Sequence, residues 1–301
     1  MENAQMKKIN GLDELKAIEL GIMKEIDSFC RERNIRYYLF HGTLLGCIRH
    51  HGFIPWDDDI DIAMPRPDFD RFVSSFSSGF CKMRRPGDSR YSYPFAKVYD
   101  ARTKLVENLI SKDDIGVYVD VFPLDGLPED PEQQARHCQK IFFWKDMIRH
   151  KFSPMKRKRS PLRQLFLPMV KFLLSPISYQ WICRRMERMS KEFDYASSPC
   201  FANLVWGYHF RSGAKKWSIG KKEWLEPAQD GVFEGCKFLI PHDSDSVLQS
   251  DFGDYMQLPP IEKRVPQHDF EAFWIAPPTE SQAAAIGQAK TSHENLDTKS
   301  H

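Results

Sequence analysis

The amino-acid sequence predicts a mixed α/β fold, in which a small mixed sheet with flanking helices is followed by a mainly helical second half. Helical and strand-like periods alternate over the first 130 residues, which is typical of an α/β sheet. From residue 131 to about 195 the pattern becomes helical and rich in basic residues. Hydrophobic residues make up 42% of the 301 residues, enough to bury a core, so a disordered or fibrous chain is excluded.

The first helix follows from apolar side chains at steps of three and four over residues 12–33, and Asn34 is expected to end it. A second helix is expected at 43–50, with Thr43 as its cap. Further helices are expected at 67–80 and 244–252. Strands are expected at 37–40, 60–64, 95–99 and 116–122, and a hairpin at 231–241.

These patterns divide the chain into four stretches. A catalytic core is expected over 1–130, and a basic, mainly helical subdomain over 131–225. A hairpin and a helix over 226–276 are expected to complete the catalytic domain. The tail over 277–301 lacks periodicity and large apolar side chains, so we expect it to be disordered.

Charge and cysteine content indicate which binding partners and which cellular compartment to expect. Lys and Arg total 43 and Asp and Glu total 41, so the net charge is only +2. The chain therefore has no strong overall positive potential that would attract nucleic acid, and no nucleic-acid partner is expected. The seven cysteines form no C-x-x-C pair and are expected to be reduced, mostly buried thiols. The N-terminal residues lack the apolar run of a secretory signal. We therefore expect a cytoplasmic protein.

The acidic run Asp57-Asp58-Asp59-Ile60-Asp61 is the strongest chemical signal. Alternate side chains of a strand share a face, so Asp59 and Asp61 are expected to project together, with Asp57 beside them if the strand begins that early. Asp58 is expected to point away and to be structural. Clustered carboxylates raise each other's pKa unless a cation neutralises them. Oxygen ligands suit hard divalent cations, so we expect Mg²⁺, with Mn²⁺ as an alternative.

A phosphate site is expected just upstream of this run. Gly42-Thr43 lies where a strand gives way to a helix, and unpaired backbone N–H groups and the helix dipole favour an anion there. Arg49 and Lys97 are further candidate phosphate ligands. Metal and helix N-terminus together supply the charge neutralisation that phosphoryl transfer requires. This combination favours a metal site over the competing interpretation, a solvated acidic loop.

A further carboxylate is expected from a neighbouring strand. Asp120 lies inside an apolar run, where a charge needs a partner. Asp125 is the competing candidate, but an Asp before Gly126 is more simply explained as a turn residue. Asp59, Asp61 and Asp120 are therefore the expected catalytic residues.

The stretch from His41 to Met64, which contains Gly42-Thr43 and the acidic run, resembles the signature of the LicD family. That family includes bacterial phosphocholine transferases and is related to the fukutin-type proteins. The resemblance covers about residues 12–274, with further matching stretches at 95–98, 120–126, 233–241 and 251–260. The region 131–222 resembles the family only loosely, so no function is carried over to it.

The resemblance implies a nucleotidyltransferase-like fold in which Asp59 and Asp61, with Asp57 and Asp120 nearby, hold Mg²⁺. It also implies a CDP-alcohol donor, with CDP-choline as the first choice. The donor would transfer its phospho-alcohol to a hydroxyl of a glycan or lipid-linked glycan at the cell surface and release CMP. The base that deprotonates this hydroxyl stays open between Asp120, Asp57 and the metal ion acting alone.

Two other functions compete with this expectation. One is nucleotidyl transfer, in which NMP is placed on a small molecule or protein and pyrophosphate is released. The other is a non-catalytic glycan-binding module, against which the intact carboxylates argue, since a degenerate site has no reason to retain clustered charges. The identity of the released product separates the two enzymes.

Basic residues beside an apolar stripe over residues 151–191 are typical of a helix that lies on an anionic membrane surface. Such a segment would place the protein peripherally on the inner face of the membrane. A helical subdomain packed on the sheet, with a solvated basic loop, explains the pattern equally well. Both interpretations are kept.

Overall fold

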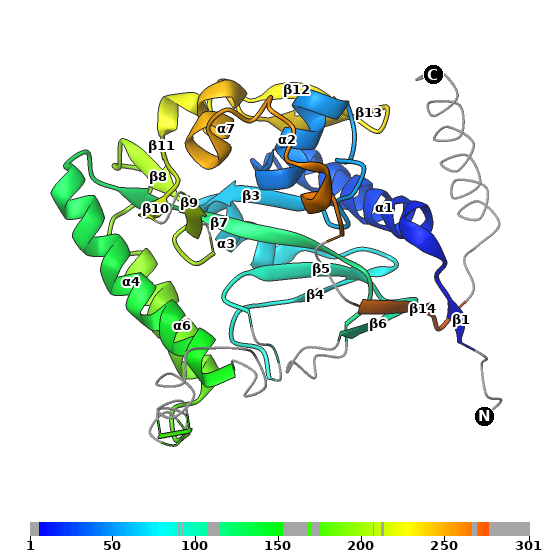
Figure 1. Cartoon of the computed structure of the whole chain (residues 1–301), viewed down its shortest axis with the longest axis horizontal. Helices are drawn as coiled ribbons and strands as arrows, with labels where there is room; N and C mark the ends of the chain where they lie inside the picture. The colour runs from blue at the N-terminus through cyan, green and yellow to red at the C-terminus, as the bar shows by residue number, and fades with distance from the viewer. Residues whose placement is uncertain are drawn as a thin grey trace.

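The computed structural model describes residues 6–89, 91, 93–107, 115–152, 168–169, 172, 175–206, 208–211, 214–266 and 270–276. A seven-stranded mixed sheet organises the fold. Strand β7 (Tyr118–Leu127) lies at its centre, and all ten of its residues are buried. It pairs in parallel with β3 (Asp61–Pro65) and antiparallel with β5 (Ala96–Asp100) and β8 (Cys200–Ala202), as Figure 1 shows.

The outer strands extend this sheet on both sides of β7. Strand β2 (Tyr38–Leu39) pairs with β3, β4 (Cys81–Arg84) with β5, and β11 (Ile219–Lys221) with β8. Outside the main sheet, β1 (Lys7–Lys8), β14 (Phe270–Trp274) and β6 (Thr103–Glu107) form a three-stranded sheet. Two hairpins are also present. One joins β9 (Tyr208–Arg211) to β10 (Ala214–Trp217), and the other joins β12 (Gln229–Phe233) to β13 (Cys236–Ile240).

Helix α1 (Gly11–Glu32) confirms the first predicted helix. Its apolar stripe, which includes Ile22 and Ile26, is buried, and the helix packs against β5 and β7. The predicted end is also confirmed, since Asn34 adopts a left-handed conformation with φ of 51°. Asn tolerates that conformation because its short polar side chain can bond locally.

Helix α2 (His41–His50) and helix α3 (Arg66–Ser75) flank β3 in the sequence. The predicted cap of α2 is wrong: its N-cap position is Phe40, and Thr43 lies within the first turn. The backbone turns sharply before this helix, so that φ at His41 is 46°. The chain therefore enters α2 two residues earlier than its side-chain pattern indicates.

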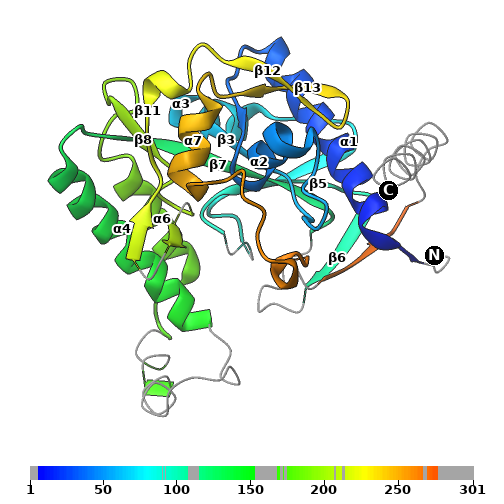
Figure 2. The same ribbon diagram turned by 45° about the horizontal axis from the view of Figure 1, so that its top comes forward.

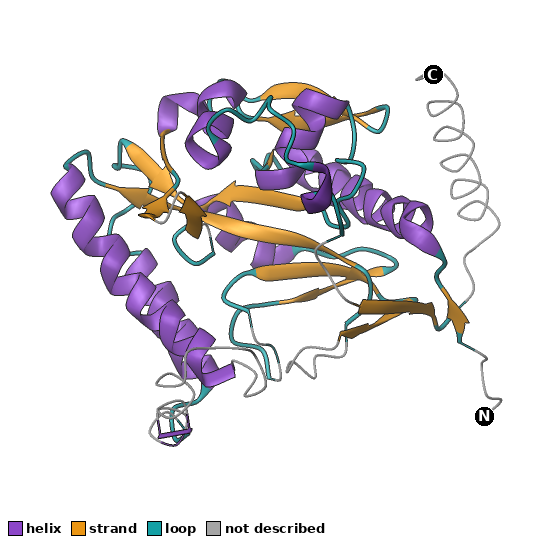
Figure 3. Cartoon of the chain, in the orientation of Figure 1, coloured by secondary structure: helices purple, strands orange, loops and turns teal. Residues whose placement is uncertain are grey.

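The prediction of a mainly helical second half is wrong. Helices α4 (Pro131–Phe152) and α6 (Tyr179–Ser190) lie side by side, but strands β8 to β14 follow them (Figure 3). These strands are short, and β8 and β14 pair with β7 and β6, which lie far away in the sequence, so no local pattern indicates β8 and β14. The predicted hairpin at β12–β13 is confirmed, as is the short helix α7 (Ser244–Phe252), which is followed by the 3₁₀ turn η2 (Ile261–Lys263).

Most buried apolar side chains belong to one core that runs from Ile9 to Trp274, so segments near both ends of the chain share it. A smaller cluster lies under α4 and α6 and includes Ile182 and Met186. The seven cysteines are free thiols and six of them are buried, as expected. Among the described residues, no helix is both long and apolar enough to cross a bilayer.

The basic apolar segment 151–191 is described only in part. Its basic run at 156–159 lies outside the described residues, as does the tail 277–301. In the described part, Phe172 is 77% exposed and Trp181 is 50% exposed. The neighbouring Ile182 is buried against α4.

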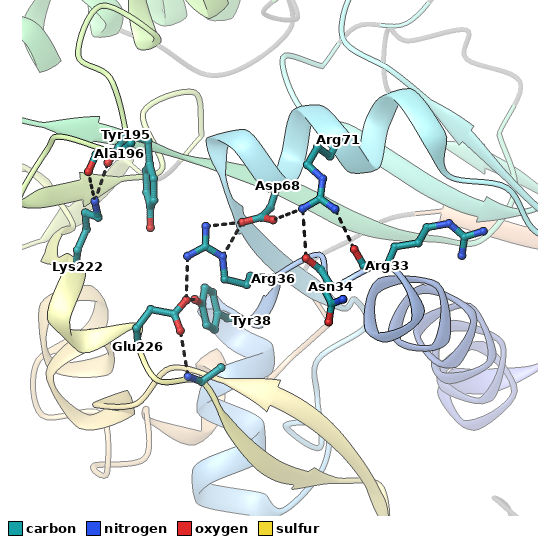
Figure 4. Close-up of polar contacts among 11 residues, drawn as sticks. Arg33, Asn34, Arg36, Tyr38, Asp68, Arg71, Tyr195, Ala196, Lys222 and Glu226 are labelled. Atoms are coloured by element: carbon teal, nitrogen blue, oxygen red, sulfur yellow. Dashed lines mark hydrogen bonds and ion pairs between the residues drawn. The ribbon is translucent and has the colours of Figure 1, made fainter.

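A polar network joins the C-terminal segments to the sheet region (Figure 4). The Arg36 guanidinium donates to Asp68 on α3 at 2.7 Å and to Glu226 at 3.2 Å. The Tyr38 hydroxyl on β2 also donates to Glu226, at 2.5 Å. Arg71 donates to two carbonyl oxygens just after α1, those of residues 33 and 34. The segment before β12 is thereby fixed against β2 and α3.

Asp125 is a strand residue of β7 and not the predicted turn residue. Its carboxylate is fully buried and accepts two bonds from the Arg66 guanidinium, at 2.6 and 2.9 Å. Arg66 opens α3, so this bidentate pair joins the helix to the central strand. A buried carboxylate requires such a partner, because desolvation of an unpaired charge is costly.

Replacing Asp125 with Ala should lower the free energy of unfolding by about 3–5 kcal/mol, because Arg66 would lose its buried counter-charge. Urea denaturation followed by circular dichroism measures the loss. Asp70 is the matched control: it pairs with the same arginine at 3.6 Å but is 47% exposed. Its replacement with Ala should cost less than about 1 kcal/mol. Equal losses in the two variants would contradict a structural role specific to Asp125.

Candidate active site

Three neighbouring strands place Asp61, Asp120 and Lys97 in one row. Asp61 opens β3 and is paired with Asp120 of β7, which in turn is paired with Lys97 of β5. Residues directly opposite one another in a sheet project on the same face. The Lys97 ammonium lies 2.6 Å from Asp120 Oδ1. The structure therefore brings together two predicted carboxylates and one predicted phosphate ligand.

Lys97 is almost completely buried, with 3% of its side chain exposed. Its Nζ lies 3.3 Å from the ring centroid of Tyr118 and 4.7 Å from that of Tyr93. Aromatic faces attract a cation, so the rings and Asp120 hold the ammonium in place. In this position its direct effect is to offset the negative charge of Asp120.

Residues 57–60 of the acidic run lie in the loop before β3, since that strand begins only at Asp61. The strand alternation expected for Asp57 and Asp59 therefore does not apply. Instead, one carboxylate oxygen from each of Asp57, Asp58 and Asp59 lies within 4.8 Å of the other two. Asp58, expected to point away, is buried but contributes to this group. A loop can turn three consecutive carboxylates toward one point, whereas an extended strand cannot.

The first turn of α2 packs directly on this loop. A Cβ on Gly42 would lie 2.8 Å from Asp57 Oδ2, so any larger residue would displace that carboxylate. The Thr43 hydroxyl accepts a hydrogen bond of 2.8 Å from the Asp61 N–H. The two predicted phosphate-site residues are thus in contact with the two ends of the acidic run.

Helix α1 also contacts this loop. The Lys16 ammonium donates to the carbonyl oxygens of Ile54 and Pro55, at 3.3 and 3.1 Å. Lys16 is buried, which lowers its pKa, while the charge of Asp57 opposes this shift. Its positive charge therefore faces the start of the acidic run.

Glu19, one turn further along α1, was not singled out in the sequence. It is 3% exposed, and its Oε2 has no hydrogen-bond partner among the described residues. Burial, reinforced by the charges of Asp59 and Asp58, raises the pKa of Glu19 well above its ordinary value. An acid on the apolar stripe of a helix, four residues after the buried Leu15, is the signal that could have identified it.

The pKa of Asp61 is shifted for the same reasons. Burial raises its pKa well above the ordinary value, and Asp59, Asp120 and Asp57 add to the shift, with Lys97 opposing it. Negative charge therefore exceeds positive charge at this site. A divalent cation bound by these carboxylates would relieve the excess.

The C-terminal segments anchor α2 above the acidic loop. His41 Nδ1 lies 2.8 Å from Asp251 Oδ2 on α7, and its Nε2 lies 3.3 Å from the Asn203 amide nitrogen. The carboxylate must accept from Nδ1–H, which leaves Nε2 to accept from the amide. Sequence reasoning did not identify Asp251 or Asn203 as partners of His41, because they lie more than 160 positions away.

Arg49, the other predicted phosphate ligand, lies in the last turn of α2. It donates to the Tyr255 carbonyl oxygen at 2.5 Å and to His50 Nε2 at 2.9 Å. Burial lowers its pKa, and the nearby positive charge of Arg264 lowers it further. Arg264 is a second basic residue of this region that sequence reasoning did not assign to the site.

The metal-free protein should become less stable as the pH rises. The folded pKa values of Glu19 and Asp61 are raised, so the folded chain retains protons that the unfolded chain releases. Stability present at low pH is lost from the ordinary carboxyl range, about pH 4, upward through the folded values. The melting temperature without divalent ions, from about pH 5 to pH 8, measures the trend.

The Glu19→Gln variant keeps the shape of the side chain but cannot ionise. Its melting temperature should therefore fall less over this pH range. Parallel curves for the variant and the wild type would show that Glu19 does not contribute.

Comparison with known proteins is consistent with this geometry. The family model described as LicD/FKTN/FKRP, nucleotidyltransferase domain, matches residues 34–155, the part that holds α2, the acidic run and β7. The chain is 31% identical over 280 residues to the lipopolysaccharide cholinephosphotransferase LicD of Haemophilus influenzae, with 89% of this chain and 99% of that protein covered.

Two shorter matches involve uncharacterised rickettsial proteins. A protein of Rickettsia typhi is 41% identical over 69 residues, which is 23% of this chain and 22% of that protein. A protein of Rickettsia prowazekii is 40% identical over 70 residues, or 23% and 26% respectively. Because its similarity to the Haemophilus enzyme extends over nearly the whole of both proteins, this chain belongs to the LicD/FKTN/FKRP nucleotidyltransferase-domain family and is a transferase.

Proposed function

We propose that this protein is a Mg²⁺-dependent phosphotransferase that moves phosphocholine from CDP-choline to a hydroxyl of a cell-surface glycan. The observation that carries the proposal is the carboxylate group at residues 57–59, next to the first turn of α2. It lies in a chain whose near full-length relative is a lipopolysaccharide cholinephosphotransferase. The acceptor is a free or lipid-linked glycan.

The donor atoms of the site fit a hard cation. Asp57, Asp59, Asp61 and Asp120 would hold the ion, and all their donor atoms are oxygens, which suits Mg²⁺, with Mn²⁺ as the alternative. The unpartnered oxygen of the buried Glu19 further supports a cation near the run. When bound, such an ion supplies charge neutralisation for the phosphoryl group and acidifies a coordinated hydroxyl.

The first turn of α2 is proposed to receive a phosphate of the donor. The first intrahelical bond runs from the Leu44 N–H to the Phe40 carbonyl oxygen, so the N–H groups of Gly42 and Thr43 precede the helical ladder. These groups and the helix dipole favour an anion. Gly42 also lets this turn lie directly against Asp57, because a Cβ at this position would come within 2.8 Å of Asp57 Oδ2.

In the proposed reaction, the acceptor hydroxyl oxygen attacks the phosphorus that carries choline. A bond forms from this oxygen to phosphorus, the bond to the bridging oxygen of the diphosphate breaks, and CMP leaves. A carboxylate takes the hydroxyl proton. Asp57 suits this role better than Asp120, because Asp120 is held by Lys97 at 2.6 Å, whereas Asp57 is half-buried at the surface of the site.

We further propose that the enzyme acts in the cytoplasm, on the inner face of the membrane where lipid-linked glycans are available. The free cysteines support a reducing compartment. The exposed side chains of Phe172 and Trp181, which belong to the basic apolar segment 151–191, support peripheral contact with lipid.

Addition of Mg²⁺ or Mn²⁺ should raise the melting temperature of the wild-type protein. An ion present at a hundred times its dissociation constant stabilises a fold by about 2.7 kcal/mol. Asp59→Asn and Asp61→Asn should each reduce this shift, because each removes a proposed ligand. Asp13→Asn, at an exposed position in the first turn of α1, should leave it unchanged. Shifts of wild-type size in both site variants would refute the assigned ligands.

Incubation with CDP-choline, Mg²⁺ and free or lipid-linked glycan should release CMP and label the glycan with phosphocholine. The Asp59→Asn and Asp61→Asn variants should release CMP at least about a hundredfold more slowly, because ligand loss should exceed the effect of losing an outer-shell partner. A panel of other CDP-alcohols tests donor identity. Pyrophosphate release from an NTP, without CMP from any CDP-alcohol, would instead identify a nucleotidyltransferase.

A further inference from the structure

Two arginines that are far apart in the sequence lie close together beside the acidic run. Arg49 comes from the last turn of α2, and Arg264 follows directly after η2. The segment after α7 runs past α2 in Figure 2, and the bond from Arg49 to the Tyr255 carbonyl oxygen fixes it there. The guanidinium groups are close enough for the charge of Arg264 to lower the pKa of Arg49.

Neither guanidinium has a carboxylate partner among the described residues. The contacts of Arg49 are the Tyr255 carbonyl oxygen and the His50 ring, both without negative charge. Arg264 donates to the Pro259 carbonyl oxygen at 2.9 Å. Many other arginines of the described chain do pair with acids: Arg31 with Asp27, Arg36 with Asp68, Arg66 with Asp125, Arg102 with Asp100, and Arg136 with Glu132.

Two half-buried like charges without a carboxylate partner among the described residues repel one another. Such an arrangement is stable when an anion binds between the groups. A guanidinium presents a planar fork of N–H donors that matches phosphate oxygens, and two forks match the charge of a diphosphate.

Trp56 links this pair to the metal site. The Arg264 guanidinium carbon lies 5.5 Å from the Trp56 ring centroid, and the His50 ring lies 6.3 Å from it. Trp56 immediately precedes Asp57. A positive patch, formed by Arg49 and Arg264, therefore adjoins the negative group at residues 57–59.

We propose that Arg49 and Arg264 form a diphosphate-binding site for the nucleotide donor, next to the metal ion. This assignment rests on the proposed function for the identity of the donor. It makes Arg264 a substrate-binding residue, although it lies outside the part of the chain that the family model matches. The C-terminal segment thereby contributes directly to the active site.

Calorimetric titration of the full chain, with Mg²⁺ present, tests the site without turnover. The probes are inorganic pyrophosphate, CDP and CMP. Arg264→Ala and Arg49→Ala should each weaken pyrophosphate and CDP binding roughly 10- to 100-fold, the effect of losing a charge-assisted bond. CMP binding should change less, because it lacks the second phosphate. Arg264→Lys keeps the charge and should give an intermediate loss.

Arg136→Ala is the matched control, because Arg136 is 70% exposed on α4 and pairs with an exposed glutamate. Its binding constants should equal those of the wild type. An unchanged melting temperature in Arg264→Ala shows that the fold is intact, and Arg264→Lys provides the test if the Ala variant does not fold.

Two results would overturn the proposal. Wild-type affinity for pyrophosphate and CDP in Arg264→Ala would remove Arg264 from any phosphate site. Loss of pyrophosphate binding with unchanged CDP binding would mean that the site does not serve the donor. If no CDP-alcohol supports transfer but the arginine variants still lose CDP binding, the proposed reaction fails while the binding site stands.

Discussion

The burial of strand β7 is the constraint on which the rest of this structure depends. All ten of its residues are buried, yet it carries two carboxylates, Asp120 and Asp125. Each requires a cation from a neighbouring element, because an unpaired charge in such a place is costly. Lys97 on β5 meets the first requirement and Arg66 on α3 the second. These two ion pairs hold β5 and α3 in place beside the central strand.

The two buried acids nevertheless serve different purposes. Asp125 is held by a bidentate guanidinium, and its oxygens are thereby committed to the fold. Asp120 has one oxygen on Lys97, and its strand neighbour is Asp61, whose own pKa is raised by the surrounding acids. Excess negative charge therefore gathers at one end of the parallel pair β3 and β7, where the acidic loop also lies. A divalent cation bound there, as proposed, would relieve this excess.

Residues far along the chain hold both ends of helix α2 in place. The family model ends at residue 155, but Asp251 and Asn203 hold His41 at the start of α2, and Tyr255 binds Arg49 at its end. Both ends of the helix proposed to receive phosphate are thus fixed by residues beyond that domain. Similarity to the Haemophilus enzyme likewise extends over 89% of the chain, beyond that domain.

The sequence by itself determined the local elements and the chemical character of the site. The spacing of apolar residues predicted α1, and the run of aspartates predicted a group of carboxylates, because both features lie within a short stretch of the sequence. Only the tertiary structure decided that residues 57–59 form a loop, that Lys97 neutralises Asp120, and that β8 to β11 are strands. It also revealed Glu19 and Arg264 beside the acidic run. Pairing register and burial depend on contacts between distant segments, which no local pattern encodes.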